Sequence, residues 1–193
     1  MTNNDWLIVA CVVIAVLIIA VIVLTRRQQA TKRLKSRFGS EYERTLDELG
    51  GQRKAEAELH QREQRVEKLE LKPLEPDERS RFTDRWRRIQ SAFVDDPGTA
   101  LTDADRLVGE VMTARGYPSA DFEERSADVS VDHAEVIESY RKAHAIALRN
   151  QKGEAGTEDL RQAMVAYRTL FDDLVGAPAN DVASDHQREE LAR

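Results

Sequence analysis

The sequence predicts an all-α protein with one N-terminal transmembrane helix, a charged helical stalk and a small antiparallel bundle of about four helices. Three observations predict this class. Residues 6–24 are apolar without exception, a run long enough to cross a bilayer. Four later segments place apolar residues at the three- and four-residue spacing of an amphipathic helix. No stretch alternates apolar and polar residues, which is the pattern of a half-buried strand.

The composition excludes several classes of protein. The chain has 193 residues, with 29 bases and 35 acids, a formal net charge of −6 and an apolar fraction of 41%. Much of that apolar fraction lies in residues 6–24, so the remainder is less apolar than an ordinary globular domain. A collagen, a disulfide scaffold and a multi-span transporter are excluded. A large enzyme with a deep core is not expected.

The apolar run is predicted to be an uncleaved transmembrane helix over residues 6–25, after a short tail, 1–5. At 1.5 Å per residue the run reaches about 28 Å, close to the thickness of the hydrocarbon core. Trp6 stands at one end, where an indole favours the interface. The alternative is a cleavable signal peptide, which would need preceding bases and a following small-x-small site. Cys11, the single cysteine, ends a lipobox-like sequence, but we expect an ordinary apolar side chain there.

Six bases follow the apolar run, and no Lys or Arg precedes it. They lie in the juxtamembrane segment 26–37 and are Arg26, Arg27, Lys32, Arg33, Lys35 and Arg37. Segments rich in Lys and Arg stay in the cytoplasm. We therefore predict a single-pass protein of the plasma membrane with its N-terminus outside and its C-terminal domain cytoplasmic. The six bases are candidate contacts to anionic headgroups; the alternative is that they act only as a topology signal.

Residues 38–72 are predicted to form the charged helical stalk. Ser40 and Glu43 have the spacing of a capping box at its start. Gly50 and Gly51 interrupt the helix or form a hinge, because glycine disfavours a helix interior.

The second half of the stalk has only a thin apolar stripe, formed by Leu59, Val66 and Leu69. Arg62 occupies a position where a coiled-coil seam would have an apolar residue. A solvated helix is therefore the favoured interpretation. Coiled-coil pairing, which would give a weak homo-oligomer, stays open.

Residues 73–176 are predicted to form the helical bundle, because Pro73 and Pro76 end the stalk and most of the aromatic residues follow. The first stripe consists of Phe82, Trp86, Ile89 and Phe93. The last residues, 177–193, have almost nothing to bury and are predicted to be disordered.

Capping signals divide this region into helices. Asp96, followed by a proline, is typical of a helix start, and Gly116 is suited to a left-handed helix end. A short helical turn is expected around residues 121–125. Asp132 is predicted to cap the third long helix, with Glu135 as its partner, and Thr157 to begin the fourth.

Candidates for a catalytic or metal site are His133, His144, Asp128 and Asp132. Histidine and carboxylate groups can act as general bases or ligands. We expect both histidines to be structural, His133 at a helix start and His144 in an apolar stripe. The sequence shows neither a nucleophile elbow nor a phosphate-binding loop. It therefore predicts no enzyme activity, no cofactor and no metal.

A local basic sequence surrounds Trp86, which is flanked by Arg85, Arg87 and Arg88. Nucleic-acid binding requires a basic face, whereas the chain beyond residue 37 has an excess of acids. We predict that Trp86 is a core residue, that the arginines pair with acids, and that nucleic acid is not a partner.

Several short motifs form a distinctive series. They are FVDDP at 93–97, ADRLV at 104–108, RGYP at 115–118, SVDH at 130–133 and TEDLRQAM at 157–164. Over residues 78–175 the chain resembles an uncharacterised family of small bacterial single-span proteins, usually described as hypothetical membrane or secreted proteins. The resemblance implies a bacterial origin and a self-contained helical module. It implies no activity and no site residues.

Three functional classes follow. The favoured class is a non-enzymatic, membrane-anchored helical interaction or adaptor module, whose partners are the lipid bilayer and another protein. The first alternative is a structural dimer or scaffold that pairs through the stalk or the transmembrane helix. The second is an enzyme or metal site around His133 and His144.

Overall fold

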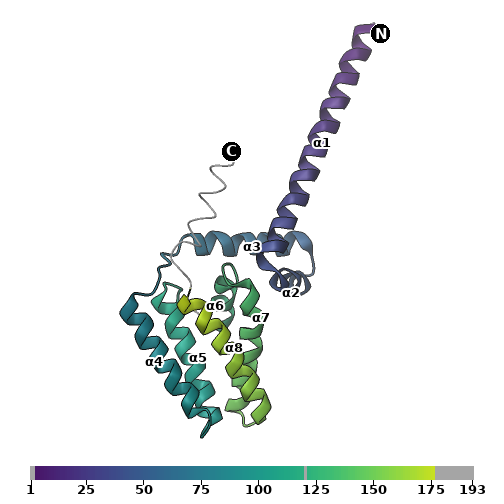
Figure 1. The fold of residues 1–193 in the computed structure, drawn as a ribbon. Helices are drawn as coiled ribbons and strands as arrows, with labels where there is room; N and C mark the ends of the chain where they lie inside the picture. Colours follow the sequence, from purple (N-terminus) through teal and green to yellow (C-terminus); the bar gives the residue numbers. More distant parts are fainter. Residues whose placement is uncertain (1–2, 120, 177–193) are drawn as a thin grey trace.

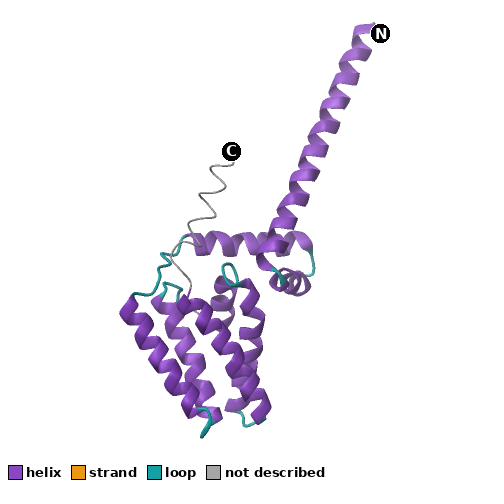
Figure 2. Cartoon of the chain, in the orientation of Figure 1, coloured by secondary structure: helices purple, strands orange, loops and turns teal. Residues whose placement is uncertain are grey.

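The computed structural model describes residues 3–119 and 121–176, and within them it contains eight helices and no strand. The predicted all-α class is confirmed (Figures 1 and 2). The tail predicted at 1–5 is already helical from Asn3 onward. The tail predicted at 177–193 lies outside the described residues.

The first helix, α1 (Asn3–Phe38), contains both the apolar run and the bases that follow it, without a break. Among the described residues it is the one helix long and apolar enough to cross a membrane. Its large apolar side chains from Ile14 to Leu24 are exposed, so the rest of the protein does not cover them. The predicted membrane-crossing helix is therefore present by length and composition, and it continues as a helix well beyond residue 25.

Two short helices, α2 (Ser40–Leu49) and α3 (Gln52–Glu67), follow through glycine corners. Gly39 and Gly50 have φ values of 51° and 64°, a left-handed conformation that glycine adopts without strain. The predicted interruption at the glycine pair is confirmed. The capping box predicted at Ser40 is wrong: Gly39 is the N-cap, and no side chain caps α2.

The expectation of a solvated stalk is wrong. Residues of α1, α2, α3 and the turn before α7 form a buried cluster, which consists of Leu34, Phe38, Tyr42, Leu59, Val66 and Val131. Leu59 and Val66, the residues that would have formed a coiled-coil seam, are buried inside the chain's own body. Arg62 is also buried on this face. We call this cluster and its surrounding polar contacts the membrane-proximal junction.

Five helices form the rest of the body. They are α4 (Pro76–Ala92), α5 (Pro97–Ala114), α6 (Phe122–Val129), α7 (Ala134–Gln151) and α8 (Thr157–Gly176). Asp96 caps α5 by accepting a hydrogen bond from the Thr99 N–H at 3.1 Å, as predicted, and α8 begins at Thr157 as predicted. A capping box between Glu75 and Glu78 begins α4.

The short helix expected near residue 121 is α6, which is longer than predicted and is capped by Asp121. The cap predicted for the next helix is wrong. The N-cap of α7 is His133, and its side chain makes no capping hydrogen bond. Asp132 instead pairs with Arg37 of α1.

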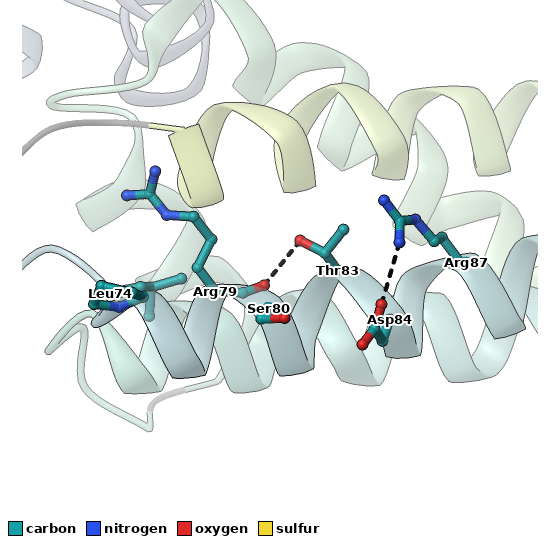
Figure 3. A pocket seen from close by; sticks show the side chains of 7 residues that line it. Leu74, Arg79, Ser80, Thr83, Asp84 and Arg87 are labelled. Carbon is teal, nitrogen blue, oxygen red and sulfur yellow. Dashed lines mark hydrogen bonds and ion pairs between the residues drawn. The ribbon is translucent and has the colours of Figure 1, made fainter.

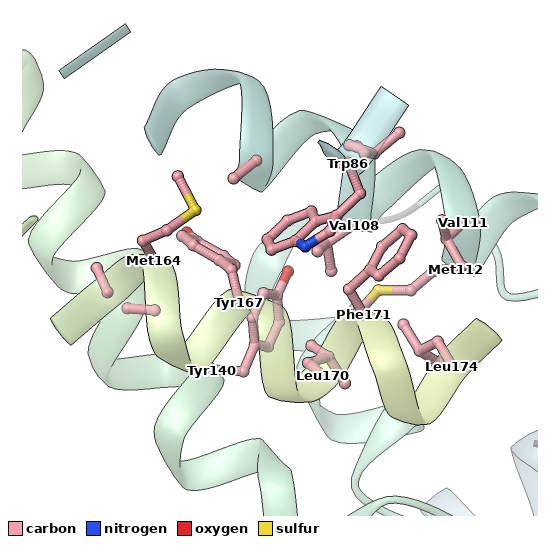
Figure 4. Packing of buried hydrophobic residues seen from close by; sticks show 14 of the residues in the cluster. Trp86, Val108, Val111, Met112, Tyr140, Met164, Tyr167, Leu170, Phe171 and Leu174 are labelled. Atoms are coloured by element: carbon pink, nitrogen blue, oxygen red, sulfur yellow. The ribbon is translucent and has the colours of Figure 1, made fainter. Parts of the chain in front are cut away.

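The main core is formed by the buried apolar residues of α4–α8, and these helices do not all contribute equally to it. Helices α5, α7 and α8 each contact the other two, whereas α4 packs along α5. Trp86 is the only buried residue of α4, and its ring stacks on Phe171 of α8 with centroids 4.8 Å apart (Figure 4). The helices follow one another in the order α4, α5, α8, α7 (Figure 1). The predicted Trp86 core position is therefore confirmed, with α4 as the outermost helix.

The segment between α3 and α4 crosses the end of α5. The Lys72 N–H donates to the Arg115 carbonyl at 2.9 Å. Next to it, Gly116 has a φ of 101°, and a Cβ atom there would lie 2.6 Å from the Glu70 carbonyl oxygen. Both the backbone conformation and the close approach require glycine at this position.

Candidate functional site at the membrane-proximal junction

The end of α1 is an integral part of the body. Leu34 and Phe38 are one helical turn apart, and Phe38 is 0% exposed. They pack with Tyr42, Leu59 and Val66 from the next two helices. Burying one phenylalanine side chain stabilises a fold by about 1.5–3 kcal/mol. The helix that carries the apolar run is therefore fixed to the body by its own last two turns.

Polar groups join α1 to α2 and α3 at the same level. Glu56 Oε1 accepts hydrogen bonds from Thr31 Oγ1 at 2.7 Å, from Gln52 Nε2 at 2.8 Å and from the Tyr42 hydroxyl at 3.1 Å. Burial would by itself raise the pKa of Glu56, but these hydrogen bonds outweigh it and lower the pKa below its ordinary value. Glu56 thus accepts from three helical segments as a carboxylate. Burial, together with the bond to Glu56, raises the pKa of Tyr42.

A buried carboxylate, Glu41, joins α2 to α3 and α7. Its side chain is 2% exposed. Arg141 donates to its two oxygens at 3.0 and 3.3 Å, and Arg62 Nη1 donates at 3.5 Å. Arg44 lies 3.5 Å away on the same helix. A buried ion pair of this kind makes the positions of α2, α3 and α7 depend on one another, because Arg62 and Arg141 share one buried carboxylate.

Arg37 turns toward the body. Its Nε atom donates to the Val131 carbonyl at 3.3 Å, and its Nη atoms lie 3.2 Å from Glu63 and 3.5 Å from Asp132. The side chain is 28% exposed. Arg37 therefore connects α1 to α3 and to the turn that precedes α7.

The other predicted membrane-surface bases divide into two groups. Arg26, Arg27, Lys32 and Arg33 are exposed along α1. Lys35 pairs with Glu43 at 3.0 Å and lies over the Tyr42 ring, 4.9 Å from its centroid. At 1.5 Å per residue, Arg26 is about 3 Å beyond Leu24 along the helix, whereas Arg37 is about 20 Å beyond it. The first bases thus lie close to the end of the apolar run, and the last two belong to the junction.

The four residues considered for catalysis or metal binding do not converge. His133 Nδ1 lies 2.6 Å from Asp173 Oδ2 of α8, and Asp128 Oδ1 accepts from Arg65 Nε at 2.6 Å. Asp132 faces Arg37, as described above. Within the described part of the chain, no three His, Cys, Asp or Glu side chains are grouped so that they could hold a metal ion.

His144 lies on α7 at the edge of the main core, partly exposed and away from His133. Its Nδ1 atom is 3.2 Å from Asp105 Oδ1, and its ring stacks on Phe122 with centroids 3.7 Å apart. Tyr167 also donates to Asp105, at 2.7 Å. Burial would raise the pKa of Asp105, but the bonds from His144 and Tyr167 outweigh it and lower the pKa.

Two surface hollows lie on the body. One, of about 480 Å³, is lined by His144, Phe122 and Leu148 together with Arg44 and Arg141, and both arginines are paired with Glu123. 

The other hollow, of about 470 Å³, is lined by residues of α4 and of the segment that precedes it (Figure 3). There Arg87 pairs with Asp84 at 3.2 Å, and Thr83 donates to the Arg79 carbonyl at 2.8 Å. The prediction that the arginines near Trp86 pair with acids is confirmed for Arg87; Arg85 likewise pairs, with Glu110 of α5.

Comparisons with protein-family models, with curated proteins and with solved structures give no match to this chain. The resemblance to small bacterial single-span proteins therefore stays a prediction.

Proposed function

We propose that the protein is a single-pass membrane protein whose helical body is a cytoplasmic, non-enzymatic interaction module held at a fixed height below the bilayer. One observation carries the proposal: Phe38, on the same unbroken helix as the apolar run, is fully buried in the body. A flexible tether would let the body move freely. The continuous helix instead restricts where a bound partner would be held.

The orientation is part of the proposal. Arg26 and Arg27 directly follow the apolar run, and no Lys or Arg precedes it. By the positive-inside rule, this asymmetry supports a cytoplasmic location for the body. The sequence resemblance supports a bacterial plasma membrane as the location.

The partner-binding part in this proposal is the bundle of α4, α5, α7 and α8. The junction residues, including Glu41 and Arg37, have intramolecular partners that connect helices. His133 and His144 have structural roles here, because each is paired with a single acid of a neighbouring helix. Tethering raises the local concentration of the bundle near other proteins of the membrane.

Two reporter fusions after Arg193 test the orientation, one active only in the cytoplasm and one active only outside it. Cytoplasmic activity supports the proposal, and external activity overturns it.

The interaction is tested with a photo-cross-linker placed in cells at Arg87 of α4 or at Glu154, in the loop between α7 and α8. A discrete cross-linked protein, lost when neighbouring surface residues are changed in a folded variant, is the expected result. If the protein and a variant with scrambled surface residues give the same cross-linked products, the result would contradict an interaction role.

A further inference from the structure

The third helix is placed between the body and the apolar part of α1. In Figure 1 the body lies on one side of α3, the apolar part of α1 extends from the other side, and α3 runs across the direction of α1. If α1 spans a bilayer, α3 lies along the membrane surface.

The two sides of α3 differ in chemistry. Its body-facing side carries its buried residues, Ala55, Leu59, Arg62 and Val66. At 100° per residue, the opposite side carries exposed residues and no carboxylate. They are Arg53, Ala57, His60, Gln61, Gln64 and the C-cap residue Lys68. We call these six residues the outward face of α3.

Three of the four acids on α3 lie at an edge of this face or beside α1, and Glu58 lies toward the body, where it pairs with Arg62. Glu67 flanks it, opposite Lys54 on the other edge. Glu63 lies toward α1, where it contacts Arg37 at 3.2 Å and His60 Nδ1 at 3.0 Å. The outward face therefore presents bases and amides, with Arg53 and Lys68 about 22 Å apart along the helix.

The contact with α1 sets the height of α3. Thr31 bonds to Glu56 at 2.7 Å and to Gln52 at 3.1 Å. Thr31 is about 10 Å beyond Leu24 along α1. Because a helix with side chains is about 10–12 Å across, the outward face lies roughly 5 Å closer to the bilayer. The headgroup layer is about 5–7 Å thick on each side, and charges act over about 8 Å at physiological salt.

We propose that α3 is a second membrane contact, whose outward face lies on the anionic headgroups of the leaflet where α1 emerges. The proposal rests on the function proposed above, because it requires α1 to span the bilayer. Arg53 and Lys68 contact the headgroups. Lys35 and Arg37 do not, because both are paired with acids of the junction. One perpendicular and one parallel helix together fix the tilt of the body as well as its height.

The test uses the full chain in phosphatidylcholine vesicles, with and without phosphatidylglycerol, and Cys11→Ser as the background. A spin label at Ala57→Cys reports collisions with a nickel-chelating lipid headgroup. We expect collisions in both kinds of vesicle, because the contact with α1 holds α3 near the headgroups, and clearly more frequent collisions in the anionic vesicles. Each of Arg53→Gln and Lys68→Gln should weaken the binding of α3 to the anionic surface about fivefold, the effect of one base near such a surface. The additional collisions seen in the anionic vesicles should fall accordingly. The matched control, Arg87→Gln with Arg88→Gln on α4, removes two exposed bases and should leave the signal unchanged.

Two reference labels separate the possible failures. A label at Glu154→Cys, in the loop between α7 and α8, gives the signal of a position remote from lipid, because these two helices extend away from α3 toward that loop (Figure 1). A label at Arg27→Cys gives the signal of a headgroup position. If Ala57 matches Glu154 while Arg27 collides, α1 spans the bilayer and the inference about α3 is wrong. If neither Arg27 nor Ala57 collides, the proposed function fails as well. Equal collisions at Ala57 in both kinds of vesicle would overturn the assignment of anionic lipid as the partner.

Discussion

In the main core α5 and α8 each bury a long stripe of apolar side chains, whereas in the membrane-proximal junction four separate segments each bury one or two. The junction adds the carboxylates Glu41 and Glu56, each with several hydrogen-bond donors from other helices. Apolar area stabilises without directional preference, while buried ion pairs and hydrogen bonds fix particular positions. The main core therefore supplies most of the stability, and the junction sets the direction of α1.

The largest expected effect is at the buried ion pair of the junction. Glu41→Ala removes the acid that Arg62 and Arg141 share. Arg62 keeps Glu58 and Arg141 keeps Glu123, so we expect a loss at the lower end of the about 3–5 kcal/mol that breaking a buried pair costs. Urea unfolding of the full chain in detergent micelles measures the loss, and hydrogen exchange locates it in α2 and α3. Glu43→Ala, an exposed acid on the same helix, is the control. A loss below about 1 kcal/mol, the size of a surface pair, would contradict the account.

Matched leucine truncations sharpen the contrast between the two regions. Leu59 in the junction and Leu107 in the main core are both fully buried, so each change to alanine should cost about 2–5 kcal/mol. Hydrogen exchange should show faster opening of α2 and α3 for Leu59→Ala, and of α5, α7 and α8 for Leu107→Ala. Identical exchange patterns in the two variants would show that the regions are not separable.

The segment that connects the two regions depends on Gly116. Gly116→Ala places a side chain at positive φ and forces its Cβ against the Glu70 carbonyl, so we expect a loss of about 1–3 kcal/mol. Gly153→Ala is the matched control, because it also has positive φ but nothing within 4 Å. Thermal unfolding of both variants measures the difference. Equal losses would mean that the contact between the new Cβ and the Glu70 carbonyl does not affect the free energy of unfolding.

A smaller effect is expected at the start of α5. Asp96→Ala removes the side chain that accepts the Thr99 N–H and should cost about 1 kcal/mol. The neighbouring change, Asp95→Ala, removes an exposed acid that is not the N-cap. Chemical unfolding should separate the two variants, and equal stabilities would contradict the capping role.

The smallest expected effect is a change in how the stability of the protein depends on pH. The pKa of Asp105 is lowered in the folded protein, so its contribution to stability is present above the ordinary carboxyl pKa of about 4. That contribution is lost as the pH falls through the lower, folded-state value. Asp105→Asn should flatten the loss of stability measured between neutral pH and pH 3 or so, in the range where carboxylates titrate. An unchanged slope would show that the bonds from His144 and Tyr167 do not favour the carboxylate.

Local signals in the sequence predicted the helices of the main core well. Asp96, Gly116 and Thr157 each mark a helix boundary where expected, because capping depends on residues close in sequence. The stripe around Trp86 also faces the core. Its spacing shows the face that is buried, but not that α4 is the outermost helix.

The junction could not be predicted in the same way. Phe38 and Tyr42 lie among charged residues, and their partner Val131 is far away in the sequence. A stripe with one apolar residue per turn is typical of a solvated helix until its partners are known. Similarly, the sequence groups Arg37 with the other bases of segment 26–37. Its acidic partners, Glu63 and Asp132, are distant in the sequence and lie next to it only in the folded chain. The aromatic residues just after the basic segment were the one signal that could have identified this region.

The distance between α1 and the body shows whether the buried end of α1 holds the two parts in one fixed arrangement. Spin labels at Gln28→Cys and Thr169→Cys, in the Cys11→Ser background of the full chain in lipid nanodiscs, give the distance distribution by pulsed electron resonance. A single narrow distribution is predicted, and it should broaden when Leu34→Ala and Phe38→Ala remove the buried end of α1. A broad distribution in the chain that keeps Leu34 and Phe38 would contradict the account, because it would show a body that moves freely on its anchor.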